Sequence, residues 1–70
     1  MKVRRLKKLM IEAINDHNET LKECQKEIHV QPSKAYHLSL KMAGIMNQIA
    51  NCKGILEVCE TLDDEDSVIE

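Results

Sequence analysis

Apolar residues recur every three or four positions along two stretches of this chain, one on each side of Pro32. This spacing lines up the apolar side chains along one side of an α-helix. Residues equally far from the turn match between the two series, for example Leu21 with Met42 and Leu6 with Leu56. The pattern predicts an all-α fold, an antiparallel two-helix hairpin. The first series, with His17 at one apolar position, is Val3, Leu6, Met10, Ile14, His17, Leu21, Cys24 and Ile28, and the second is Ala35, Leu38, Met42, Ile45, Ile49, Cys52, Leu56 and Cys59.

The two series also set the organisation of the chain. We expect a first helix over residues 3–29, a turn over residues 30–33 and a second helix over residues 34–62. Pro32 cannot continue the first helix, and the second helix begins either with Pro32 at its first position or with Ser33 as its N-cap. The hairpin then occupies residues 1–62. Residues 63–70 form an acidic C-terminal tail, which we expect to be frayed.

The second helix carries a further apolar series that one partner helix cannot cover. At 100° per residue, this series lies roughly 145° around the helix from the first. Its small residues would let another helix approach closely, and an interior glycine costs up to about 1 kcal/mol relative to alanine, which suggests a packing reason. We therefore expect a homo-oligomer, most simply a two-fold dimer that forms a four-helix bundle. The predicted interface is Tyr36, Leu40, Ala43, Met46, Asn47, Ala50, Gly54 and Val58.

The composition agrees with a small intracellular helical protein. The 70 residues include no Trp, no Phe and one Tyr, so the core must consist mainly of aliphatic residues. A domain of this size usually needs a disulfide, a bound metal or a partner chain to be stable. The apolar stretch Leu9–Ile11 is too short for the core of a signal peptide, and no run approaches the roughly 20 apolar residues of a membrane span. We expect a cytoplasmic protein that does not cross a membrane.

Charge is sorted along the chain although the formal net charge is only −2. The first eight residues hold five bases and no acid, whereas seven acids and no base follow from Glu57 onward. In an antiparallel hairpin these two clusters lie side by side, so we expect them to pair with each other. Bases of this segment are also the candidate contacts for a nucleic acid or an acidic partner: Lys2, Arg4, Arg5 and Lys8.

Residues with reactive or metal-binding side chains are few, and their spacing does not suggest a site. Cys52 and Cys59 lie about 10 Å apart along one helix, too far to bind one metal ion. We expect them and Cys24 to act as small core residues. His17 is expected to form a polar layer in the seam between the helices, where it would set the register. No catalytic motif or phosphate-binding loop is present, so we expect neither an enzyme nor a cofactor.

These features favour a small oligomeric interaction protein that binds another macromolecule, with a protein as the expected partner. A first alternative is binding of RNA or DNA through the basic N-terminal segment. The hairpin with His17 in its seam and an acidic tail resembles, in architecture, the plasmid-encoded Rop family of RNA-binding four-helix bundles. A second alternative is an oligomer that holds a small ligand between protomers, in contact with Tyr36, His37 and Asn47.

Overall fold

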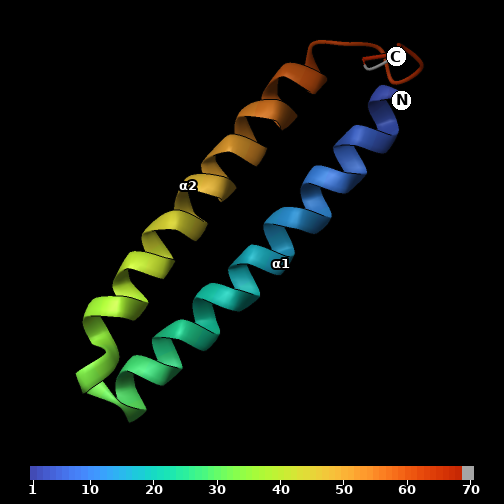
Figure 1. Cartoon of the computed structure of the whole chain (residues 1–70). Helices are drawn as coiled ribbons and strands as arrows, with labels where there is room; N and C mark the ends of the chain where they lie inside the picture. Colours follow the sequence, from blue (N-terminus) through green and yellow to red (C-terminus); the bar gives the residue numbers. More distant parts are fainter. Residues whose placement is uncertain (69–70) are drawn as a thin grey trace.

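The computed structural model describes residues 1–68 and contains two antiparallel helices that pack along their length (Figure 1). Helix α1 spans Val3–Val30 and helix α2 spans Ala35–Glu60, and the short 3-10 helix η1, Pro32–Lys34, joins them. The molecule measures 49 × 19 × 14 Å. The all-α hairpin predicted from the two apolar series is confirmed.

The turn between the helices is built around Pro32. The backbone N–H of Gln31 donates to the Glu27 carbonyl at 2.7 Å and so closes the last turn of α1. Pro32 then occupies the first position of η1, where its missing N–H and its fixed φ angle suit a helix start. Lys34, rather than Ser33, is the N-cap residue of α2, and it makes no side-chain capping hydrogen bond. Pro32 therefore begins η1, whereas α2 itself begins at Ala35.

The interface between α1 and α2 follows the two predicted series. Every position of both series is buried or half-buried, whereas the polar back of α1 is exposed. The most deeply buried side chains are few and mostly aliphatic or sulfur-containing, and no polar side chain is buried among the described residues. This small core is spread along the whole seam: Val3, Cys24, Ile45, Ile49 and Cys59.

The segment that follows α2, which the sequence predicts to be frayed, lies against the start of α1. After Glu60 the chain crosses over to the start of α1, so that residues 61–68 and the N-terminus lie at the same end of the hairpin (Figure 1). The N–H of Val3 donates to the Asp66 carbonyl at 2.9 Å, and the N–H of Arg4 donates to the Asp64 carbonyl at 3.2 Å. We call residues 61–68 the C-terminal segment. Ile69 and Glu70, which belong to the predicted tail, lie outside the described residues.

The start of α1 explains why this segment is held in place. The first N–H groups of any helix lack partners within the helix. The N-cap residue Lys2 makes no side-chain capping hydrogen bond, and the first turn of α1 contains no acid. The carbonyls of the C-terminal segment accept these N–H groups instead, and its carboxylates lie at the positive end of the α1 dipole. The C-terminal segment therefore caps α1.

Candidate interaction surfaces

The predicted second series forms a continuous exposed strip on α2, which we call the outer face of α2. All eight of its residues are exposed in the hairpin. The exposed fraction is 73% for Tyr36, 58% for Leu40 and for Met46, and 62% for Val58. None of its residues carries a charge. α1 has a single apolar side, and it faces α2, so the outer face of α2 is left without a covering element within the described hairpin.

The two glycines of α2 have no packing role within the hairpin. A Cβ atom added at Gly44 or at Gly54 would meet no atom outside the local helix backbone within 4 Å. Both backbones are ordinary right-handed helix, because no residue of the described chain has a positive φ. If the glycines have a packing reason, it must lie outside the hairpin.

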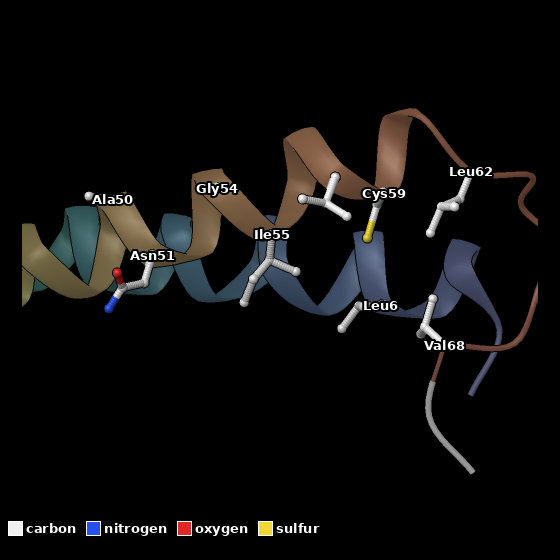
Figure 2. A pocket seen from close by; sticks show the side chains of 9 residues that line it. Leu6, Ala50, Asn51, Gly54, Ile55, Cys59, Leu62 and Val68 are labelled. Carbon is white, nitrogen blue, oxygen red and sulfur yellow. The ribbon is translucent and has the colours of Figure 1, made fainter.

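An apolar groove of about 500 Å³ lies beside Gly54 at the open end of the hairpin. Figure 2 shows Ala50 and Gly54 along its α2 side and Leu6 and Val68 on the opposite side, with Ile55 and Cys59 between them. Val58 and Leu62 complete its apolar lining. The groove was not predicted, because it depends on Leu62 and Val68, which the C-terminal segment brings to this place.

The basic N-terminal segment is largely engaged by the C-terminal segment. Glu65 accepts the Lys2 ammonium at 3.1 Å and the Arg4 guanidinium at 2.8 Å, and Asp64 accepts the Lys7 ammonium at 2.7 Å. The hydrogen bond from Lys7 to Asp64 raises the pKa of the Lys7 ammonium above its ordinary value. The expected pairing of the two charge clusters is thus present.

The four bases proposed as a nucleic-acid contact are divided by these ion pairs. Lys2 and Arg4 pair with Glu65, whereas Arg5 and Lys8 make no ion pair within residues 1–68. Arg4, Arg5 and Lys8 share a shallow surface depression with Leu9 and Glu12. Lys7 was absent from the predicted contacts, and its place beside Asp64 follows from the same charge sorting.

The remaining candidate residues lie as isolated groups. His17 is half-buried in the seam, and its side chain makes no hydrogen bond to the described part of the chain. The three cysteines are free thiols, with Cys24 and Cys59 buried. No cluster of three or more His, Cys, Asp or Glu side chains within residues 1–68 is arranged to hold a metal ion.

The three residues proposed to contact a small ligand do not converge within one chain. The rings of Tyr36 and His37 form an edge-to-face pair with centroids 5.7 Å apart. Asn47 lies about 16 Å further along α2, at 1.5 Å per residue. A ligand could touch all three residues only between protomers.

Comparison with known proteins adds no assignment, because no protein family, no curated protein and no solved structure matches this chain. Neither helix in the described range combines the length and the apolar character that crossing a membrane requires.

Proposed function

We propose that this chain is a small helical interaction protein that self-associates through the outer face of α2 and acts by binding another macromolecule, without catalysis. The observation that carries the proposal is the outer face itself, an uncharged strip with four large apolar side chains that are more than half exposed. Contiguous exposed apolar surface on a soluble protein typically marks an interaction site.

The small core supports this proposal. Only five hydrophobic side chains of the described hairpin are buried, and one of them is Val3 at the very start of α1. A chain of this size buries too little apolar surface to be comfortably stable alone. Covering the outer face of α2 with a second hairpin would place α2 in the centre of a four-helix bundle, with α1 outside.

Sedimentation of the purified protein tests the self-association. We expect a mass that is a multiple of the 8.0 kDa chain at micromolar concentration. Ala50→Arg places a charge in the middle of the outer face and should reduce the mass to that of one chain, while circular dichroism shows unchanged helix content. Asn15→Arg, on the exposed back of α1, is the matched control and should leave the mass unchanged. A single-chain mass for the unmodified protein would refute the proposal.

Nucleic-acid binding is the second candidate, and Arg5 and Lys8 are the observation that favours it. Both side chains are exposed on α1 and are not engaged by the C-terminal segment. Glu65 and Asp64 occupy three of the neighbouring bases, however, and no aromatic side chain lies among them to stack on a base. The outer face of α2 is therefore the better supported surface.

A further inference from the structure

The outer face of α2 has two large side chains near its start and two small residues toward its end, with Met46 and Val58 as its other large side chains. Its N-terminal half presents the large side chains of Tyr36 and Leu40, which are 73% and 58% exposed. Its C-terminal half presents Ala50 and Gly54, with open space where a Gly54 side chain would lie. The apolar groove of about 500 Å³ adjoins this small-residue half and includes both residues in its lining.

The spacing of the large and small residues matches when one copy of the strip is reversed against another. From Tyr36 the strip advances four residues to Leu40 and then three to Ala43. From Gly54 it steps back four residues to Ala50 and then three to Asn47. Reversal of a second copy therefore sets Tyr36 opposite Gly54, Leu40 opposite Ala50, and Ala43 opposite Asn47. The two large side chains near the start of the strip, Tyr36 and Leu40, then each face a small residue.

A parallel arrangement would not pack in this way. It would set Tyr36 against Tyr36 at one end and Gly54 against Gly54 at the other, which crowds one end and leaves a void at the opposite end. The cores of stable interfaces pack as densely as protein interiors, so both errors are costly. Size complementarity thus favours the antiparallel arrangement.

Charge favours the same direction. α2 follows Lys34 and ends at Glu60, with Glu57 one turn earlier. An antiparallel pair brings the basic start of each helix toward the acidic end of the other and opposes the two helix dipoles. Between Tyr36 and Gly54 the strip itself is free of charge, so no like charges meet at its centre.

We propose that two copies of this chain pair through the outer face of α2 in an antiparallel, two-fold arrangement, with the Tyr36 ring of each copy seated over Gly54 of the other, beside the apolar groove. This assignment rests on the proposed function and adds the partner, the direction and the register. The arrangement is isologous, so the Tyr36–Gly54 contact occurs twice in each dimer.

Exchange of the two side-chain sizes tests the register. Gly54→Leu fills the space that Tyr36 needs, and Tyr36→Ala leaves that space empty. Each change should weaken the dimer by about tenfold or more, because the contact occurs twice in each dimer. The double variant Tyr36→Ala/Gly54→Leu restores a large residue opposite a small one and should recover most of the affinity. Analytical ultracentrifugation over a dilution series measures the dissociation constants, and circular dichroism verifies the hairpin.

Two features make the result decisive. The Cβ atom of Gly54→Leu would meet nothing within 4 Å in the hairpin, and the change removes an interior glycine, so it should not unfold the single chain. Gln48→Leu is the matched control, because it adds a leucine at an exposed position about 100° around the helix from Asn47 and should leave the affinity unchanged.

Tyr36 provides an independent signal. It is the single tyrosine of a chain without Trp or Phe, so intrinsic fluorescence reports on this residue alone. We expect acrylamide to quench Tyr36 efficiently in dilute protein and weakly once the dimer forms. A monomeric unmodified protein would overturn the proposed function together with this register. A stable dimer whose Tyr36 stays open to quencher, or whose double variant binds no better than either single variant, would overturn the register alone.

Discussion

Val3 lies at the junction of α1 and the C-terminal segment, and its truncation offers a quantitative test of the capping interaction. The third residue of a chain is usually exposed, but the Val3 side chain is fully buried here, and its N–H donates to the Asp66 carbonyl at 2.9 Å. Val3→Ala removes two buried carbon groups. At about 0.8 kcal/mol for each group, the transfer loss is about 1.6 kcal/mol, and the cavity left behind raises the total to about 2–3 kcal/mol.

The assay is thermal and urea unfolding, followed by circular dichroism at one fixed protein concentration, since self-association would otherwise shift the midpoint. A loss of 1 kcal/mol lowers the midpoint of a domain of this size by roughly 4–8 °C, so Val3→Ala should lower it by about 10 °C or more. Ile11→Ala, at a half-exposed position of α1, is the control and should cost much less.

The same substitution in a chain that ends at residue 62 completes a double-mutant cycle. If the C-terminal segment covers Val3, the cost of Val3→Ala should fall below about 1 kcal/mol in the shortened chain, which gives a coupling of more than about 1 kcal/mol. Equal costs in both chains would refute the role of the C-terminal segment as the cover of Val3.

Three further predictions concern the charged surfaces. Glu65→Gln removes the partner of Lys2 and Arg4, and the resulting small loss of stability, measured by thermal unfolding, should disappear at high salt because these pairs are exposed. Because the pKa of Lys7 is raised in the folded state, its ion pair with Asp64 stabilises the fold fully below the ordinary lysine pKa of about 10.4. This stabilisation is lost as the pH rises through the higher folded-state pKa. The difference in unfolding midpoint between the unmodified protein and Lys7→Gln should therefore shrink at high pH. A difference independent of pH would contradict this. In a gel-shift assay at low salt, a nucleic-acid complex that depends on Arg5 and Lys8 should be lost on Arg5→Glu/Lys8→Glu, whereas the absence of any shift by the unmodified protein would exclude the basic-segment alternative.

The seam of the hairpin could be predicted from the sequence because it depends on a repeated local pattern. Spacing of three and four residues fixes which side of each helix is apolar, and the single Pro32 fixes where the direction reverses. Even His17, which is polar, lies half-buried in the seam where the spacing placed it. The exposure of Tyr36, Leu40 and Val58 follows from the same reasoning, since α1 can cover only one side of α2.

The C-terminal segment could not be predicted in this way because backbone groups and a local turn hold it. The Asp63 carboxylate accepts the N–H of Glu65 at 3.1 Å, and the Asp63 backbone carbonyl accepts the N–H of Asp66 at 3.0 Å. Such aspartate turns leave no periodic signal. One sequence feature did indicate that the first N–H groups of α1 need acceptors from elsewhere. The N-cap residue Lys2 has no capping side chain, and the first turn, which begins at Val3, has no acid.

The two helices differ in what the rest of the chain supplies to each of them. The first turn of α1 has no capping side chain of its own, and the C-terminal segment of the same chain caps it. Backbone hydrogen bonds and ion pairs therefore join the two at the end of the hairpin opposite the turn. The outer face of α2 is exposed, and no element within residues 1–68 covers it. Gly54 adjoins a groove that the hairpin leaves unfilled, and Tyr36 extends from the opposite half of the same strip. The antiparallel pairing that we propose would cover the outer face of α2 with a second copy of the same strip.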